Sequence, residues 1–259
     1  MERLTIVKVG GKVVEDKNSL DELLKQFSMI RGKRILVHGG GKLATSLAEK
    51  LGIETQMVEG RRITDAATLE VVTMVYAGLV NKSIVAGLQA KGCNSVGLTG
   101  ADLNVIRAVK RPVKTIDYGF VGDILGVNTS ELRILLNEEV VPVMAPITHD
   151  GRGQLLNTNA DTIAADLAIE LSNYYTVNLF YCFEKKGVLL NPEDENSVIS
   201  ELNYDRFKEL QVNGTIKEGM IPKLDNGFGA MRNGVSQVLI TNPFQISMAR
   251  GTRLSLRND

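Results

Sequence analysis

The sequence predicts an α/β fold in which helices cover both faces of a mainly parallel central sheet. Two observations carry this prediction. Short runs of β-branched and other apolar residues, typical of buried parallel strands, recur along the chain. Amphipathic segments with helical spacing separate these runs, and an alternation of strands and helices without repeats is typical of this class. A chain of 259 residues suits one large domain or two closely packed lobes.

The expected elements follow from this alternation. We place strands at residues 4–9, 34–38, 95–98, 140–145, 177–183 and 236–241. We place helices at residues 20–27, 43–51, 64–91, 130–137, 160–171, 204–210 and 223–233. Residues 104–127 alternate in polarity and contain three glycines, which predicts a hairpin flap outside the core sheet.

Composition excludes several classes of partner. Lys+Arg and Asp+Glu number 30 each, so the net charge is zero and no bulk affinity for nucleic acid or anionic membranes is expected. The N-terminal apolar run is too short for a signal sequence, and no run approaches the ~20 apolar residues of a membrane span. Cys93 and Cys182 are expected to be buried free thiols of a cytoplasmic protein. Two cysteines and two histidines do not favour a zinc site.

Glycine clusters end the first two predicted strands. Gly10-Gly11 follows the strand at residues 4–9, and the triplet at residues 39–41 follows the strand at 34–38. Glycines there let the backbone approach a ligand closely, and the amides that open the next helix can hold anions. In open α/β sheets this carboxyl edge is where ligands bind. The sequence therefore predicts two sites of phosphate or carboxylate size at one edge.

Known glycine motifs narrow the chemistry. Neither the P-loop pattern nor the dinucleotide fingerprint G-x-G-x-x-G occurs. The segment His38-Gly39-Gly40-Gly41 is similar to the oxyanion-hole element of esterases, but the chain has no G-x-S-x-G elbow, and His149 comes too early for that triad. Phosphoryl transfer fits better, because it needs positioning and positive charge more than covalent help. Lys8 and Lys223 are candidates for that charge.

A series of segments resembles the amino acid kinase family, and within it the branch that acts on N-acyl-L-glutamates. The resemblance extends from Lys8 to about Gly234. Each segment alone is weakly specific, whereas their order and spacing together are strongly specific. The segments are Lys8-Val9-Gly10-Gly11, Val37-His38-Gly39-Gly40-Gly41, Gly60-Arg61-Arg62-Ile63-Thr64-Asp65, Ala77-Gly78 with Asn81-Lys82, Gly119-Phe120-Val121-Gly122, Asn157-Thr158-Asn159-Ala160-Asp161 and Gly219-Met220-Ile221-Pro222-Lys223.

The resemblance implies an open three-layer αβα sandwich that forms a single domain over residues 1–259. Its N-terminal lobe, about 1–150, would bind the substrate and dimerise, and its C-terminal lobe, about 151–259, would bind ATP. The implied reaction transfers the ATP γ-phosphoryl group to the γ-carboxylate of an N-acyl-L-glutamate in arginine biosynthesis. Among these substrates the resemblance favours N-acetyl-L-glutamate. Mg²⁺ would be held mainly by phosphates and water, without metal ligands from the protein.

Residue roles carry over from the resemblance in three groups. Lys8 and Lys223 would neutralise the transferring phosphoryl group, and Asp161 would orient both lysines. Substrate would contact the amides of Gly40 and Gly41, the side chain of Asn157, and Arg62, whose planar fork suits a carboxylate better than a lysine does. The nucleotide would contact Gly10, Gly11, Glu184, Lys185, Lys186, Gly187, Val188, Leu189, Thr215, Ile216 and Lys217.

Each of these residues also has a purely structural interpretation. Lys8 could extend to the surface, and Lys223 and Asp161 could simply occupy the first turns of helices. Asn157 could be a cap, and Arg62 could belong to a solvated basic pair. His38 is better explained as a hydrogen-bonding residue at the strand end than as a catalyst.

Two departures from the family pattern affect specificity. The nucleotide loop has Phe183-Glu184, where relatives usually have a small hydroxyl residue and an aspartate before the glycine. Arg61 stands where many relatives have an apolar residue, which suggests the hypothesis that a charged acyl group such as succinyl replaces acetyl. Arginine-inhibited members carry an extra N-terminal helix, whereas the first strand here is expected at residue 4, so we expect a homodimer insensitive to arginine.

Two other functions compete with acylglutamate phosphorylation. A sibling kinase of the same fold, acting on aspartate, glutamate, carbamate or uridylate, would lack this combination of segments. A non-catalytic sensor of the acyl-amino acid or nucleotide is favoured only by the altered loop at Phe183. Lys8, Asp161 and Lys223 argue against a sensor, because it has no transition state to stabilise.

Overall fold

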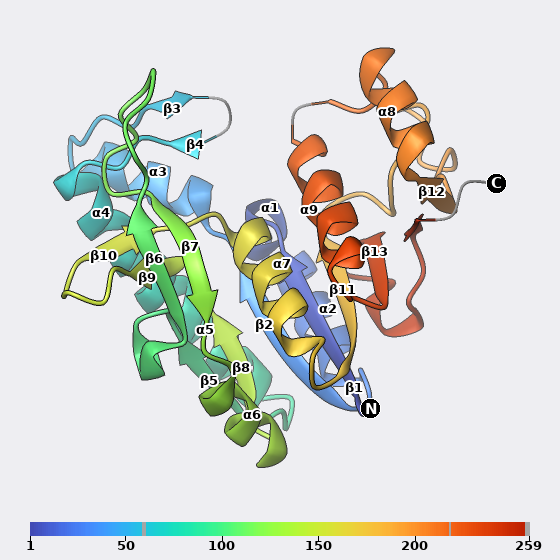
Figure 1. Ribbon diagram of the computed structural model, residues 1–259, viewed down its shortest axis with the longest axis horizontal. Coiled ribbons are helices and arrows are strands. Elements are labelled where there is room, and N and C mark those ends of the chain that lie inside the picture. The colour runs from blue at the N-terminus through green and yellow to red at the C-terminus, as the bar shows by residue number, and fades with distance from the viewer. Residues whose placement is uncertain (59–60, 218, 257–259) are drawn as a thin grey trace.

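The computed structural model describes residues 1–58, 61–217 and 219–256, and it confirms the α/β fold (Figure 1). One eight-stranded sheet has the strand order β12-β14-β13-β11-β1-β2-β8-β5. Every neighbouring pair is parallel except β13 with β14. Its strands are β1 (Arg3–Val9), β2 (Lys33–His38), β5 (Ser95–Leu98), β8 (Val141–Met144), β11 (Thr176–Cys182), β12 (Glu201–Asn203), β13 (Gln237–Thr241) and β14 (Thr252–Ser255).

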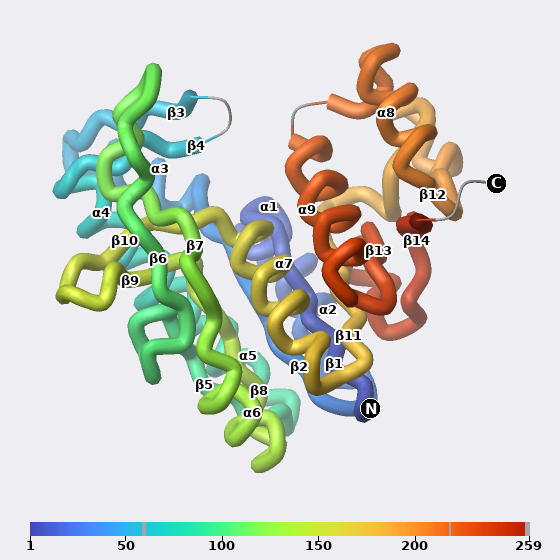
Figure 2. Tube along the Cα trace, in the orientation of Figure 1, coloured from blue at the N-terminus to red at the C-terminus, as the bar shows by residue number. Residues whose placement is uncertain are grey.

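Two smaller sheets flank the N-terminal half. The predicted flap is a hairpin of β6 (Ile106–Lys110) and β7 (Gly122–Val127), joined by β9 (Ile147–His149) and β10 (Leu155–Asn157) in the order β10-β9-β6-β7. The short strands β3 (Met57–Val58) and β4 (Arg61–Arg62) form a second pair. An isolated bridge between Thr64 and Gly119 ties the two sheets together, and Figure 2 shows the hairpin running alongside β3 and β4.

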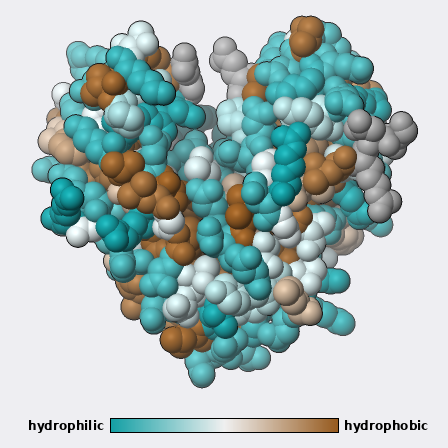
Figure 3. Space-filling model, in the orientation of Figure 1, coloured by the Kyte–Doolittle hydropathy of each residue, from teal (hydrophilic) through white to brown (hydrophobic). Residues whose placement is uncertain are grey.

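Helices cover both faces of the large sheet. Figure 1 shows α7 and α9 in front of it, with α2 behind. The helices are α1 (Gly11–Glu15), α2 (Lys17–Ser28), α3 (Gly41–Lys50), α4 (Ala66–Thr73), the π-helix η1 (Met74–Val80), α5 (Asn81–Gln89), the 3₁₀ turn η2 (Asp102–Asn104), α6 (Thr129–Asn137), α7 (Ala160–Leu171), α8 (Tyr204–Val212), α9 (Ile221–Arg232) and the 3₁₀ turn η3 (Ile246–Met248). Figure 3 shows the surface hollowed between the parts that carry β3–β4 and α8–α9.

Alternation along β1 divides the core into two layers. Leu4 and Ile6 join the cluster that includes side chains of α7 and α9, whereas Val7 and Val9 join the cluster behind the sheet. Because side chains of a strand point alternately to opposite faces, Lys8 lies on the same face as Leu4 and Ile6. The period-two pattern of the strand therefore aims Lys8 toward α7.

The helix expected over residues 64–91 differs in detail. It begins at Ala66, because the Asp65 side chain accepts a hydrogen bond from the Thr68 amide at 2.7 Å and so caps it. It runs without a break through η1 to Gln89. Length and composition would let Ala66–Gln89 cross a membrane, contrary to the expectation that no such segment exists. The same composition suits a core helix, and Val72, Val75 and Ile84 pack behind the sheet.

Candidate active site

Lys8 lies near the carboxyl end of β1, buried between β2 and β11. Its register partners are Val37 and Tyr181. Its ammonium group lies 2.7 Å from Oδ1 of Asp161, and both side chains are 8% exposed. A buried ammonium group needs such a partner, because transfer of an unpaired charge from water is costly. The structural alternative, in which Lys8 extends to the surface, is therefore wrong.

Asp161 is placed by the cap of α7. The Asn159 side chain accepts hydrogen bonds from the amides of Asp161 at 2.8 Å and Thr162 at 3.1 Å. This cap fixes the first turn, which holds Asp161 beside the positive end of the helix dipole. The Tyr181 hydroxyl donates to the Asp161 carbonyl oxygen at 3.2 Å, which ties α7 to β11.

Lys223, in the first turn of α9, completes the centre. Its ammonium group lies 3.2 Å from Oδ2 of Asp161 and also donates to the carbonyl of Gly219 at 3.2 Å. Two lysines thus share one carboxylate, although residues 8, 161 and 223 are far apart in the sequence. The arrangement holds two cations and one anion, so it presents excess positive charge.

Burial and pairing act in opposite directions on these groups. Burial lowers the pKa of Lys8, and the Asp161 carboxylate partly opposes this change. Burial by itself raises the pKa of Asp161, but Lys8 and Lys223 outweigh it, and the pKa stays below its ordinary value. Asp161 is therefore ionised at neutral pH.

The two glycine turns lie side by side at the carboxyl ends of β1 and β2. A Cβ atom on Gly11 would lie 3.6 Å from the amide nitrogen of Gly41 and 3.7 Å from that of Gly40. One on Gly40 would lie 3.1 Å from the ring of Tyr76. The two backbones thus approach each other and Tyr76 closely, which glycine allows, and amides gathered in this way can hold an anion.

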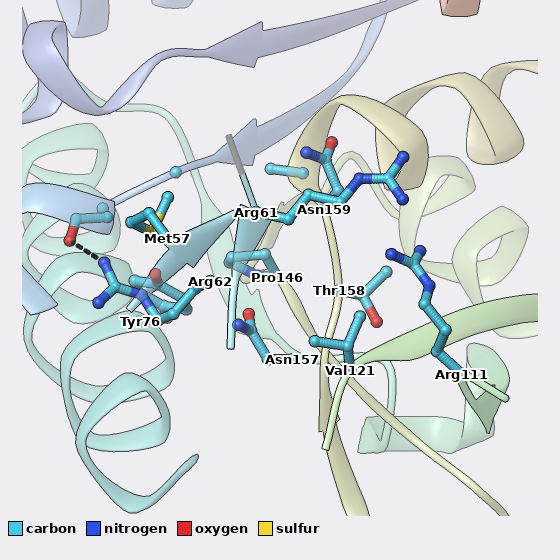
Figure 4. A pocket seen from close by; sticks show the side chains of 14 residues that line it. Met57, Arg61, Arg62, Tyr76, Arg111, Val121, Pro146, Asn157, Thr158 and Asn159 are labelled. Carbon is cyan, nitrogen blue, oxygen red and sulfur yellow. Dashed lines mark hydrogen bonds between the residues drawn. The ribbon is translucent and has the colours of Figure 1, made fainter. Parts of the chain in front are cut away.

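A cavity of about 200 Å³ opens beside the second glycine turn (Figure 4). Arg62 lies at one end, where its Nη2 atom donates to the carbonyl of Gly41 and to Oγ1 of Thr45, each at 2.8 Å. Its Nη1 atom is buried and has no hydrogen-bond partner among the described residues. The cavity is lined by Gly39, Gly40, Gly41, Met57, Arg61, Arg62, Tyr76, Arg111, Val121, Pro146, Asn157, Thr158, Asn159 and Ala160.

Asn157 lies at the end of β10, inside the same cavity. Its side-chain Nδ2 donates to Oγ1 of Thr64 at 3.0 Å. The hydroxyl of Thr64 in turn donates to the carbonyl of Arg62 at 3.2 Å. This chain of hydrogen bonds fixes the Asn157 amide and leaves its Oδ1 atom to face a ligand. The structure thus brings together all four residues expected to bind substrate; Gly60 of the same motif lies outside the described residues.

A second cavity, of about 140 Å³, lies beside the start of α9. We call it the nucleotide slot; its walls are mainly apolar, and Val188, Leu189 and Ile216 are buried there. Its lining is Phe183, Lys185, Gly187, Val188, Leu189, Pro192, Thr215, Ile216, Lys217 and Met220. A mainly apolar slot of this kind suits a nucleobase.

Two of the residues expected at the nucleotide point elsewhere. Glu184 pairs with Lys12 at 2.5 Å, and Lys186 lies 3.9 Å from Glu195. Neither lines the slot. Gly10 and Gly11 do not line it either; they lie at the start of α1.

Sequence reasoning missed Tyr76 and Arg111, which both line the substrate cavity. Tyr76 lies in the π-helix η1. A π-helix often occurs at functional sites, but no pattern of residues in the sequence predicts it here. Arg111 follows β6 directly, and only the register of the hairpin distinguishes it from its basic neighbour Lys110. The basic pair Lys110-Arg111 in the predicted hairpin was the only feature of the sequence that could have indicated Arg111.

Known proteins share this fold and sequence. The sequence profile of the amino acid kinase family matches residues 3–242, and the chain belongs to that family. It is 61% identical over 251 residues to a Phocaeicola vulgatus protein named acetylglutamate kinase, covering 97% of this chain and 98% of the relative. A Bacteroides fragilis protein of the same name is 58% identical over 253 residues, covering 98% and 97%. A Streptococcus mutans crystal structure superposes with a TM-score of 0.82 at 25% identity, covering 98% and 99%.

Proposed function

We propose that this kinase is an N-acetyl-L-glutamate 5-kinase of arginine biosynthesis. The single observation that carries the proposal is the buried centre of Lys8, Asp161 and Lys223, which adjoins both cavities. Asn159 and Ala160, which line the substrate cavity, directly precede Asp161. Met220, which lines the nucleotide slot, belongs to the same turn as Lys223. Relatives with more than half of their residues identical bear the name acetylglutamate kinase.

The cavity offers a partner for each group of the substrate. Arg62 has a free, buried Nη1 donor for the α-carboxylate. The Oδ1 atom of Asn157 can accept from the N–H of the acyl-amide, because its Nδ2 atom is held by Thr64. The γ-carboxylate is then directed toward the glycine turns and the lysines.

Phosphoryl transfer needs little more than these parts. An oxygen of the γ-carboxylate attacks the γ-phosphorus of ATP, and the bond from that phosphorus to the bridging oxygen breaks, which yields an acyl phosphate and ADP. Lys8 and Lys223 stabilise the charge on the transferring group, and amides of the glycine turns hold its oxygens. Asp161 positions the lysines and does not itself react. No general base is required, because the attacking carboxylate is already ionised at neutral pH.

ATP fits the slot and the first glycine turn together. The base would lie against Val188, Leu189 and Ile216, and the phosphates would extend toward the amides of Gly10 and Gly11. When bound, Mg²⁺ would supply further charge neutralisation to the phosphates. Among the described residues no group of three His, Cys, Asp or Glu side chains could hold it, so phosphates and water would be its main ligands.

The lobes, the assembly and the location belong to the same proposal. Residues up to about 150 would form the substrate lobe, and residues from about 151 the ATP lobe. We expect a cytoplasmic homodimer. The exposed side chains of Met74 and Leu79 in the N-terminal lobe would contribute an apolar surface to its interface. The sensor alternative is disfavoured, because a binding protein needs no pair of lysines locked on one carboxylate.

The test is direct formation of the acyl phosphate. Purified protein is incubated with MgATP and N-acetyl-L-glutamate, and hydroxylamine traps the product as a hydroxamate. We expect hydroxamate and ADP in equal amounts, and neither product without the acceptor. ATP binding with no hydroxamate would overturn N-acetyl-L-glutamate as the acceptor.

A further inference from the structure

The substrate cavity has a second basic end. Figure 4 shows Arg62 and Tyr76 on one side, and the guanidinium groups of Arg61 and Arg111 together on the other. Arg61 and Arg111 also line an adjoining cavity of about 470 Å³. The two arginines therefore stand where the substrate cavity continues outward, and we call this region the acyl subsite.

Arg111 is held in place with a donor to spare. Asp123 accepts from its Nε at 3.0 Å and its Nη2 at 2.5 Å, and the guanidinium group lies 5.4 Å from the ring centre of Tyr118. Its Nη1 atom is buried and has no hydrogen-bond partner among the described residues. A buried donor without a partner costs about 1–3 kcal/mol, so this geometry is explained best by a ligand that accepts the hydrogen bond.

The charge around the acyl subsite is unbalanced. Lys114 joins Arg61 and Arg111 in its lining, and Asp123 is the one carboxylate among the lining residues. Three cations and one anion leave an excess of positive charge. An acetyl group ends in a neutral methyl group, which forms no ion pair with these cations.

The substrate groups already placed leave one direction for the acyl chain. Arg62 receives the α-carboxylate, and the glycine turns receive the γ-carboxylate. The acyl-amide on Asn157 then extends away from Arg62, toward Arg61 and Arg111.

We infer that the acyl subsite binds an acyl group that ends in a carboxylate, of which succinyl is a common example. This inference rests on the proposed kinase activity and widens its acceptor from N-acetyl-L-glutamate to N-acyl-L-glutamates whose acyl group ends in a carboxylate, with the same γ-carboxylate as the attacking group. Arg61 and Arg111 are its specificity-determining residues: Arg111 offers a fixed Nη1 donor, and Arg61 adds charge from the solvent side of β4. A planar guanidinium group forms strong, directional hydrogen bonds with a carboxylate.

Three substrates separate the effect of the terminal carboxylate from the effect of acyl chain length. N-succinyl-, N-butyryl- and N-acetyl-L-glutamate are compared by kcat/KM with saturating MgATP, since butyryl has the reach of succinyl without its charge. The variants are Arg61→Gln and Arg111→Gln. The matched control is Arg107→Gln, on strand β6, which leads to Arg111, but outside both cavities.

We expect succinyl to exceed butyryl at least tenfold in kcat/KM for the unaltered protein. Each variant should lower this ratio about tenfold or more, the effect of one charged hydrogen bond, and Arg107→Gln should leave it within twofold. A ratio near one, or a ratio that neither variant changes, would overturn the acyl subsite while the kinase assignment stands. No turnover of any of the three substrates would instead overturn the proposed function, and the subsite with it.

Discussion

The phosphoryl-transfer centre and the nucleotide slot are built in opposite ways. The centre joins three charged side chains from β1, α7 and α9, buried and locked into one network. The slot is lined mostly by two short stretches around Val188 and Ile216, apolar and partly open. Removal of one charged side chain from such a network is strongly destabilising, because the remaining charges stay buried without a partner. An apolar wall loses only the area that is removed, so its defects should be small and local.

The largest effect should follow a break in the charge network. Asp161→Asn leaves buried Lys8 without its anion, so we expect a loss of about 3 kcal/mol or more in the free energy of unfolding. The lysines also lose their alignment, and kcat should fall at least ~100-fold. Urea unfolding and steady-state kinetics measure both quantities.

Asp225→Asn is the matched control on the surface of α9. Asp225 pairs with Lys208 at 3.4 Å, and both side chains are exposed. Its loss should cost less than about 1 kcal/mol and leave kcat unchanged. Equal costs at the two sites would show that the centre is no different from a surface pair.

The sequence was most informative where local pattern and chemistry coincide. Alternation in β1 places Lys8 on the face of α7, and the cap at Asn159 predicts the helix that carries Asp161. Their meeting with Lys223 required the family resemblance, because nothing local relates positions so far apart. The strands β3, β4, β9, β10, β12 and β14 were not expected, since strands of two to four residues depend on partners brought in by the tertiary fold.

The sites divide in the same way. Arg62 and Asn157 belong to recognisable segments, whereas Tyr76 and Arg111 reach the cavity through a π-helix and a hairpin register. Glu184 and Lys186 were expected at the nucleotide from their place in the loop. Their side chains pair with Lys12 and Glu195, and whether they contact a nucleotide remains a prediction.

The substrate end should respond through binding. Arg62→Lys keeps the charge but loses the planar fork, so the KM for N-acetyl-L-glutamate should rise about 100-fold. We expect kcat and the KM for ATP to change less than threefold, because Lys8 and the slot are untouched. A comparable rise in the KM for ATP would show that the two ends of the site are not separate.

The glycine turn links the centre to a buried histidine. His38 is fully buried, with Nδ1 2.9 Å from the carbonyl of Gly39 and Nε2 3.1 Å from Nδ2 of Asn81. Burial lowers its pKa to about 4. Between that pH and the ordinary pKa of about 6.5, the unfolded chain binds a proton that the folded chain does not. Stability should therefore fall as the pH is lowered through this window.

From pH 7 to pH 5 this linkage should remove about 2 kcal/mol from the free energy of unfolding. His38→Gln should abolish that part of the acid sensitivity, measured as the difference from the unaltered protein in urea titrations. An unchanged pH profile in His38→Gln would show that His38 does not support the glycine turn in its neutral form.

The smallest effect should follow a change in the slot wall. Ile216→Ala removes part of a buried apolar side chain, worth roughly 1–2 kcal/mol, so the KM for ATP should rise about tenfold. The KM for N-acetyl-L-glutamate should stay within twofold. Val212→Ala, an exposed position on α8, should change neither constant. A loss confined to kcat would contradict a role of the slot in binding.

Lys8 should act on the transferring phosphoryl group and not on binding or folding alone. The most direct measurement is the single-turnover rate of Lys8→Met, with both substrates saturating, beside the Kd for ATP from calorimetry. We predict a rate at least ~100-fold below that of the unaltered protein, as expected for removal of one preorganised charge, with the Kd within about fivefold. A rate within tenfold of the unaltered protein would contradict the account.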